Sequence, residues 1–411
     1  MSWIRKGSRE FMQEINKAYV LTVLRERAPI SRYDISKVTG LSPTTVGTAV
    51  KELIEAGLVH EIGSGESKGG RRPRLLDLNG KGGVLIGVGL DSNVAGVMDV
   101  WGQLLYKTPP SRSKTGIIMP IPHVSDLIRQ AIEGSGVSKD KIMGIGICLP
   151  GIVSQPAGIV TYSAVLGWKD IPLKSMIEEE FGFPTFVDTD GVAIAMGEKW
   201  LGMALEESIE DFIYFYIGRG VSVVIVVGGQ VYRGFKGTAG EFGHTTIDHN
   251  GPLCDCGGRG CLENYTSIPA ILSKVDKVIK EGRSTKLLEL AHGDPDNITF
   301  DLFLDGLEQG DPLAKEIIEE TGHLLGIGIA NLVNLLNPQM VIVGGDLVKA
   351  GDLLISTIVK ECKERSLRIP AESVKIVPAM SLLSQVDAEI LGGGTLVLQE
   401  LFKIPNVIVG R

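Results

Sequence analysis

From residue 82 onward, the sequence alternates between short apolar segments bounded by glycines and longer segments with helical periodicity. The apolar segments, such as VLIGVGL and KIMGIGICLPGIV, have the length and β-branched content of buried strands. Strands that alternate with helices form α/β layers, in which ligands bind at the carboxyl ends of the strands or between lobes. This alternation predicts an α/β fold for most of the chain.

The chain is too long for a single hydrophobic core. With 411 residues, 44% of them hydrophobic, it can build two or three domains with a normal core in each. We expect a first domain over residues 1–80 and a first α/β lobe over residues 81–195, completed by a C-terminal helix at about residues 385–411. A second lobe over residues 196–384 would carry the oligomerisation surface.

The sequence gives no sign of a membrane protein or of a secreted one. It has no apolar run of about 18 residues or more, and the N-terminal MSWIRKGSREFMQEINK lacks the apolar core of a signal peptide. We therefore expect a cytoplasmic protein. Three of the five cysteines fall within eight residues, and in a reducing compartment such a cluster favours metal binding over disulfides.

The first 80 residues have the pattern of three helices followed by a hairpin. Apolar residues at helical spacing predict a first helix over residues 9–27. Ser31 and Gly40 have the residue types of an N-cap and a left-handed stop for a short second helix. Ser42 opens a third helix, which Gly57 closes.

The second and third helices are joined by a tight turn and are predicted to form a helix-turn-helix. Near its start, the third helix carries short hydrogen-bonding side chains and a cation, which suit base edges and phosphates in a major groove. The predicted DNA contacts of this helix are Ser42, Thr44, Thr45, Thr48 and Lys51.

After the third helix, two strand candidates flank a glycine-rich tip that ends in GGRRPR, typical of a wing. Arg71 and Arg72 on this tip suit a narrow minor groove or the phosphates beside it. Residues 1–79 hold 13 Lys and Arg against 9 Asp and Glu, a net charge of +4, whereas the remainder holds 28 against 40, a net charge of −12. A basic head on an acidic body indicates DNA binding. The alternatives are a protein-docking module and chance scatter of charge.

Residues 240–263, GEFGHTTIDHNGPLCDCGGRGCLE, bring four soft or borderline ligands into one short stretch. These are His244, Cys254, Cys256 and Cys261. Thiolates and imidazole suit Zn²⁺, and four of them complete a tetrahedron with no open position for water. The spacing therefore predicts a structural zinc site and no catalytic metal centre. Free cysteines crowded into a loop, or a disulfide, are the alternatives.

The string E-x-G-H followed by C-x-C-G-x-x-G-C-x-E resembles the zinc-site signature of the ROK family, a group of repressors and sugar kinases with the actin-like ATPase fold. The head with GGRRP resembles the ROK repressors, notably the xylose-repressor type, and GICLPGIV, LGWKDIPL and VIVGGDLVKAG match family landmarks in order. The resemblance spans the whole chain. It implies a winged helix-turn-helix domain followed by a two-lobed, sugar-kinase-like body.

The ROK sugar kinases need glycine-rich phosphate loops, and the resemblance locates both loops here. The first, D-x-G-G-T in kinases, reads DSNVA from Asp91, with Val94 in the cradle; the second, G-T-G-I-G-G-G, reads IGRGVSVV from Ile217. The first loop has lost its glycines and the second most of them, so backbone amides are less open to a phosphate. Gly344 and Gly345 match the adenosine-side turn. We expect no enzyme activity.

The resemblance also implies effector-binding residues. Asp190 matches the carboxylate that in kinases takes the proton from the sugar hydroxyl; it would be catalytic only in a kinase, and it can equally accept a hydrogen bond. Glu241, His244 and Glu263 match sugar-contacting residues, with His244 offering its second ring nitrogen to a hydroxyl. The alternative for both glutamates is a solvated or salt-bridged side chain near the metal loop.

Thr189 and Val165 stand where the family often has asparagine, so we expect an effector other than glucose, such as a pentose, a cyclic polyol or a modified sugar. The prediction is a sugar- or polyol-responsive repressor of carbohydrate catabolism, a homodimer or homotetramer that binds operator DNA. Effector binding would change the spacing of the heads in a dimer. The alternatives are an ATP-dependent sugar kinase with a DNA-binding head and a repressor controlled by a protein partner.

Overall fold

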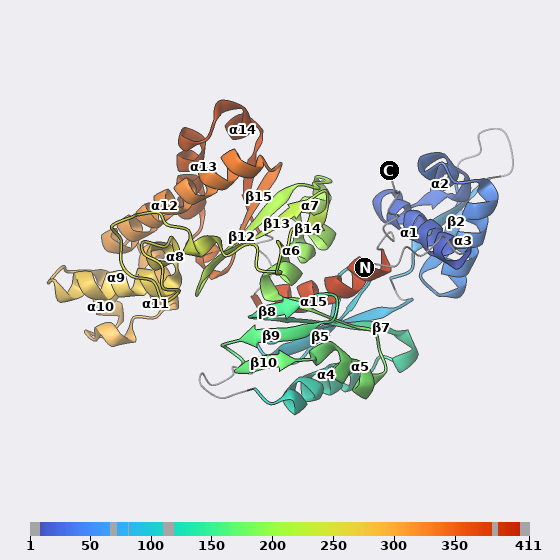
Figure 1. The fold of residues 1–411 in the computed structure, drawn as a ribbon, viewed down its shortest axis with the longest axis horizontal. Coiled ribbons are helices and arrows are strands. Elements are labelled where there is room, and N and C mark those ends of the chain that lie inside the picture. The colour runs from blue at the N-terminus through green and yellow to red at the C-terminus, as the bar shows by residue number, and fades with distance from the viewer. Residues whose placement is uncertain (1–8, 66–71, 81, 110–118, 380–384, 403–411) are drawn as a thin grey trace. The chain divides into compact units, whose positions relative to one another are not determined.

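The structure is a computed structural model that describes residues 9–65, 72–80, 82–109, 119–379 and 385–402. The chain forms two compact units, residues 1–193 with 389–411, and residues 194–388 (Figure 1). The predicted domain boundaries near residues 80, 195 and 384 stay predictions. Among the described residues, none of the helices combines the length and apolarity that a bilayer crossing needs.

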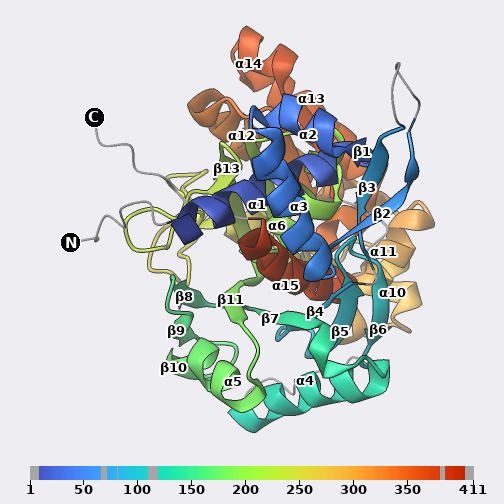
Figure 2. The ribbon, with the colours of Figure 1, turned by 90° about the vertical axis from the view of Figure 1, so that its right-hand side faces the viewer.

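The first unit begins with three helices, α1 (Arg9–Arg27), α2 (Arg32–Thr39) and α3 (Pro43–Glu55). A small antiparallel sheet in the order β1-β3-β2 completes the winged helix-turn-helix (Figure 2). Its strands are β1 (Ile30–Ser31), β2 (Val59–Ser64) and β3 (Arg74–Leu78). The predicted winged head is therefore confirmed, although its sheet has a third strand that the sequence did not indicate.

Serine side chains cap the starts of α2 and α3, and a glycine ends α2. Ser31 Oγ accepts a hydrogen bond from the Asp34 N–H at 3.2 Å, and Ser42 Oγ accepts one from the Thr45 N–H at 3.1 Å. Gly40 ends α2 in the left-handed conformation with φ of +70°. These local signals are the ones from which the helix ends were predicted.

The rest of the first unit is built on a five-stranded sheet in the order β11-β7-β4-β5-β6. Strands β11, β7 and β4 run parallel, whereas β5 and β6 continue the sheet antiparallel. The strands are β4 (Val84–Gly89), β5 (Val94–Asp99), β6 (Leu104–Lys107), β7 (Ile142–Leu149) and β11 (Thr185–Thr189).

Helices pack against both faces of this sheet. The apolar residues of α4 (Ile121–Ser135) and α5 (Leu173–Phe181) share one core with Val84, Ile86 and Val88. On the other face, α15 (Gln385–Leu401) lies so close that a Cβ on Gly87 would come within 1.8 Å of the Ile390 carbonyl oxygen. Glycine is therefore required at the contact between the sheet and α15.

A second, small sheet in the order β10-β9-β8 follows β7. Its strands are β8 (Ile152–Ser154), β9 (Ile159–Ser163) and β10 (Trp168–Ile171). The indole N–H of Trp168 donates to the Met119 carbonyl oxygen at 2.7 Å, which anchors the small sheet to the segment before α4. A separate sheet was not expected from the sequence.

The second unit also has a five-stranded sheet, in the order β14-β13-β12-β15-β16. The hairpin of β12 and β13 is antiparallel, and β15 pairs with β12 in parallel. The strands are β12 (Phe212–Ile217), β13 (Val221–Val227), β14 (Gln230–Val231), β15 (Met340–Gly344) and β16 (Lys375–Pro378).

The helices of the second unit contribute one large core around Phe215, Phe303 and Leu325. The longest is α12 (Pro312–Leu336), which packs against α13 (Asp352–Arg365). The others are α7 (Met203–Glu206), α8 (Glu263–Thr266), α9 (Ile268–Lys280), α10 (Lys286–Leu290), α11 (Phe300–Glu308) and α14 (Arg368–Ser373). Helix α6 (Asp190–Leu201) contains the crossing from the first unit to the second.

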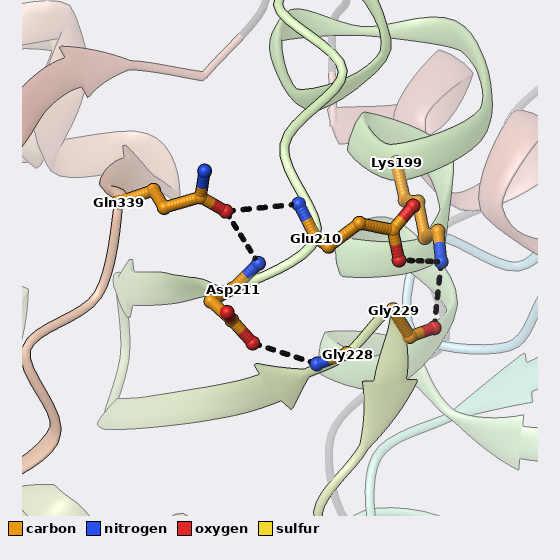
Figure 3. A network of polar contacts seen from close by, with 6 residues as sticks. All are labelled: Lys199, Glu210, Asp211, Gly228, Gly229 and Gln339. Atoms are coloured by element: carbon orange, nitrogen blue, oxygen red, sulfur yellow. Dashed lines mark hydrogen bonds and ion pairs between the residues drawn. The ribbon is translucent and has the colours of Figure 1, made fainter.

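A polar network fastens one end of this sheet (Figure 3). Lys199, on α6, donates to the Gly229 carbonyl oxygen at 2.7 Å and pairs with Glu210 at 3.3 Å. Gln339 Oε1 accepts hydrogen bonds from the N–H groups of Glu210 and Asp211, at 3.2 and 3.0 Å. The network joins the end of α6 to the β13–β14 turn and to the starts of β12 and β15.

Candidate functional sites

The four predicted metal ligands lie together in the loop between β14 and α8. Their ligand atoms are all within 4.8 Å of one another. His244 Nδ1 is 3.7 Å from Cys254 Sγ, and Cys256 Sγ is 3.7 Å from Cys261 Sγ. A disulfide would hold two sulfurs about 2.0 Å apart, so these cysteines are free thiols.

The donor set fits a tetrahedral metal ion. Metal–sulfur bonds of about 2.3 Å place two sulfurs of a tetrahedron about 3.8 Å apart. The distance of 3.7 Å between Cys256 Sγ and Cys261 Sγ agrees with this edge. Burial, and then the neighbouring Cys256 and Cys254 thiols, raise the pKa of Cys261 to about 12. The cluster could therefore hold a metal ion, whose positive charge would allow the thiols to ionise.

The backbone of the loop is shaped around these ligands. Gly260 has a φ of +65°, and a Cβ on it would come 1.6 Å from the Asp248 carbonyl oxygen. The Gly258 N–H donates to Cys256 Sγ at 3.3 Å. Cys254 and Cys261 are buried, whereas Cys256 is exposed. Gly260 thus lies at a close backbone contact that only glycine fits.

The start of β13 is bonded to the segments that carry the effector-binding residues predicted for the second lobe, Glu241, His244 and Glu263. Glu263 begins α8, and its carboxylate accepts a hydrogen bond from the Val221 N–H at 2.8 Å. The Gly240 carbonyl oxygen, just before Glu241, accepts one from the Val223 N–H at 2.9 Å. His244 directs Nδ1 toward Cys254, which leaves Nε2 on the opposite side of the ring.

Asp190 belongs to the first unit, where it follows β11 and begins α6. Its Oδ1 accepts a hydrogen bond from the Gly191 N–H at 2.8 Å. Burial of the carboxyl, together with the charge of Asp91, raises the pKa of Asp190 to about 7. Of the two replaced asparagine positions, Thr189 accepts from the Val192 N–H at 3.3 Å, and Val165 is 63% exposed.

The turn that begins at Asp91, which the resemblance assigned to phosphate binding, contacts a carboxylate that the sequence did not indicate. Glu389, on α15, accepts from the Ser92 N–H at 3.1 Å and from the Ser92 hydroxyl at 2.7 Å. Glu389 is 1% exposed, and burial, with the charges of Asp91 and Asp190, raises its pKa to about 8. The donors that a phosphate would need are thus engaged by the protein's own carboxyl group.

The same turn keeps its shape without glycine. Asn93 adopts a φ of +53°, a conformation that asparagine tolerates better than most residues. Its side-chain oxygen is 2.6 Å from His123 Nε2. Val94 starts β5 and is fully buried, so its side chain lies in the core of the first unit.

In the second turn, between β12 and β13, a backbone donor is likewise bonded to a carboxylate. The Val221 N–H at its end is bonded to the Glu263 carboxylate, and Arg219 at its tip is exposed. Gly344 and Gly345, which matched the adenosine-side turn, are needed for packing. A Cβ would come 2.0 Å from the Tyr214 hydroxyl at Gly344 and 2.3 Å from the Ile217 carbonyl oxygen at Gly345.

The predicted DNA contacts of α3 differ in their exposure. Thr44, Thr48 and Lys51 are exposed at spacings that place them on one helix face. Ser42 is exposed but serves as the N-cap, and its oxygen is 2.8 Å from that of the half-buried Thr45.

Arg72 of the wing is exposed. Arg71 and the glycines before it lie outside the described residues.

Comparisons with known proteins agree with this architecture. The model of the ROK family matches residues 84–400, and a winged helix-turn-helix DNA-binding model matches residues 20–60. A xylose repressor from Caldicellulosiruptor bescii is 33% identical over 406 residues, which cover 97% of this chain and 99% of that protein.

Two solved structures show how far the likeness extends. A ROK family transcriptional regulator, a homologue of the E. coli MLC protein, has a TM-score of 0.83 at 28% identity, over 95% of this chain and 97% of that one. A ROK family glucokinase from Streptomyces griseus, in complex with glucose and AMPPNP, has a TM-score of 0.65 at 27% identity, over 77% of this chain and all of that one. The likeness to the regulator thus extends over more of the chain than the likeness to the kinase.

Proposed function

The chain belongs to the ROK family, and we propose that it is a sugar- or polyol-responsive transcriptional repressor of carbohydrate catabolism genes. The observation that carries the proposal is the combination of a winged helix-turn-helix with a kinase-like body whose phosphate turns are bonded to carboxylates. The similarity to a xylose repressor over nearly the full chain supports it. The protein would act in the cytoplasm, as a homodimer or homotetramer on operator DNA.

The head would read DNA through the exposed face of α3. Thr44 and Thr48 offer short hydroxyl groups to base edges, and Lys51 offers a cation to a phosphate. Arg71 and Arg72 would reach the minor groove or the flanking phosphates from the wing. Each neutralised phosphate would add to the salt dependence of binding.

The effector would be held by hydrogen bonds between its hydroxyl groups and Glu241, His244 and Glu263, with both carboxylates as acceptors. Asp190 would accept from a further hydroxyl. Glu263 is fixed by its hydrogen bond from the Val221 N–H, and His244 by its contact with Cys254. These fixed positions support a preformed set of polar groups. Zn²⁺ bound by His244, Cys254, Cys256 and Cys261 would supply the crosslink that holds this loop. Its role would be structural, because four protein ligands leave no open position.

The proposal favours a repressor over a sugar kinase because the donors of the first phosphate turn are already bonded to a carboxylate. At the first turn Glu389 engages both donors of Ser92, and at the second Glu263 engages the N–H of Val221. A nucleotide phosphate would have to displace these groups. Phosphate binding normally relies on free backbone amides and nearby cations, the opposite arrangement.

Operator affinity in the presence of candidate effectors tests the proposal. A duplex would first be enriched from random-sequence DNA by binding to the full chain, and its affinity then measured with pentoses, hexoses and polyols. We expect one ligand to weaken binding by about tenfold or more, a coupling of about 1.4 kcal/mol. Glu263→Gln should blunt this response and leave DNA affinity in the absence of ligand unchanged.

Two outcomes would contradict the proposal. One is the failure of the chain to enrich any duplex, and the other is a duplex whose affinity no ligand changes. Transfer of phosphate from ATP to a sugar, abolished by Asp190→Asn, would support the kinase alternative instead.

A further inference from the structure

Gly47 stands in the interior of α3, where glycine is a poor choice. It is the fifth of the thirteen residues of the helix. Glycine in a helix interior shifts the equilibrium toward the unfolded helix by about fivefold relative to alanine. A glycine at such a position calls for a reason that offsets this loss.

The structure of the protein itself supplies no such reason. Gly47 does not have a positive φ, and a Cβ built on it would meet no atom within 4 Å. One usual reason for a glycine is a positive φ, as at Gly40, where φ is +70°. The other is a close neighbour that leaves no room for a side chain, as at Gly306 on α11, where a Cβ would come 2.2 Å from Leu287. At Gly47 the space beside the backbone is open.

The position of Gly47 on the helix shows what this open space faces. Thr44 lies three residues before it and Lys51 four residues after it, so all three lie on neighbouring turns of one side of α3. Thr44 and Lys51 are exposed, whereas Val46 and Val50 point into the core of the head. Gly47 therefore leaves bare backbone within the face that carries the predicted DNA contacts.

We propose that Gly47 is the point where α3 lies closest to DNA, with the edge of a base pair in the major groove packed against the helix backbone. The inference rests on the proposed DNA binding by the head. A major groove about 12 Å wide takes a helix of about 10–12 Å across with little room to spare. A methyl group at residue 47 would push the helix outward and lengthen the hydrogen bonds of Thr44 and Thr48.

Gly47→Ala in the full chain separates this role from a purely structural one. Alanine should strengthen α3, so its amide hydrogens should exchange about fivefold more slowly. The same change should weaken binding to a duplex enriched by the wild-type chain by about tenfold or more. Binding to a scrambled duplex of equal length should change much less, because nonspecific contacts are made to phosphates.

Val38→Ala provides the matched control. Val38 is 41% exposed on α2, and alanine there also raises helix propensity without changing α3. It should leave both affinities as they are in the wild type. Retention of wild-type affinity by Gly47→Ala would overturn the inference, and so would an equal loss on both duplexes, which would indicate a phosphate contact. A wild-type chain that enriches no duplex would instead contradict the DNA-binding proposal.

Discussion

The Glu389 carboxyl is buried beside charges of its own sign. Its donors are the N–H and hydroxyl of Ser92, and the charges of Asp91 and Asp190 disfavour its ionisation. A Cβ on Gly89 would come 2.2 Å from Glu389 Oε2, so the carboxyl also depends on a glycine in β4. This one side chain therefore links the first turn to α15 within the first unit.

Glu389→Gln should reduce the pH dependence of stability. The pKa of Glu389 is raised from an ordinary value of 4.5 to about 8, so the folded chain keeps a proton that the unfolded chain loses as pH rises between these values. The free energy of unfolding should therefore fall over this window in the wild type. The glutamine variant, which cannot ionise, should be more stable at pH 8 by up to a few kcal/mol, with no advantage below pH 4.5. Urea unfolding at a series of pH values measures this.

Glu361→Gln offers a control of opposite sign. Hydrogen bonds from Arg365, and then from His323, hold the pKa of Glu361 below its ordinary value of 4.5. The wild type should therefore gain stability from Glu361 above that pH, and the glutamine variant should lose stability there. If Glu389→Gln also lost stability at pH 8, the assignment of a raised pKa to Glu389 would be wrong.

At the scale of elements, Ser42 has two possible roles that a substitution can separate. Its oxygen caps α3 by accepting from the Thr45 N–H, and it was also predicted to touch DNA. Ser42→Ala should destabilise the head by about 1 kcal/mol through loss of the cap. Ser42→Asn should restore stability, because asparagine caps equally well. DNA affinity that returns with asparagine would indicate capping alone, whereas affinity that stays low would indicate a direct contact of the serine.

The metal loop is the second element open to a test. Cys256→Ser removes an exposed ligand, so a metal-loaded chain should lose most of its bound metal and its response to effector. DNA affinity without effector should persist, because the head lies outside the loop. Cys362→Ala, a change at a buried cysteine of α13, should leave the metal content unchanged. Elemental analysis and operator binding are the two measurements, and an intact effector response in Cys256→Ser would separate the loop from the pocket.

The elements that the sequence predicted are those whose signals are local. The caps Ser31, Gly40 and Ser42 lie within a few residues of the helix ends that they determine. Each long apolar strand is one continuous segment, and the four predicted metal ligands all fall within residues 240–263. The strands β8, β9 and β10 were missed because each is short, with only three to five residues. The contact between Ser92 and Glu389 joins residues 297 positions apart, and a lone glutamate in AEILGGGTLVL was its only sign.

At the scale of the whole molecule, the proposed dimer makes a geometric prediction about DNA. The two heads of a dimer are held together through their bodies. They must therefore bind half-sites on the same side of the duplex, one helical turn or a multiple of it apart. An insertion of about 5 base pairs between the half-sites turns one of them to the far side, so one head must let go. Affinity should then drop by about 100-fold, the lower range of what linked binding adds.

A second insertion tests whether the loss comes from geometry. Adding about 10 base pairs returns the second half-site to the same side and should recover part of the affinity, because only the distance has changed. A Lys51→Ala variant should bind both inserted duplexes more weakly than the wild type does. The ratio of its affinities for the two duplexes should equal the wild-type ratio, because the change weakens each head equally. Equal binding to the original duplex and to the one with half a turn inserted would show that a single head carries the affinity, and the dimeric mode of repression would be wrong.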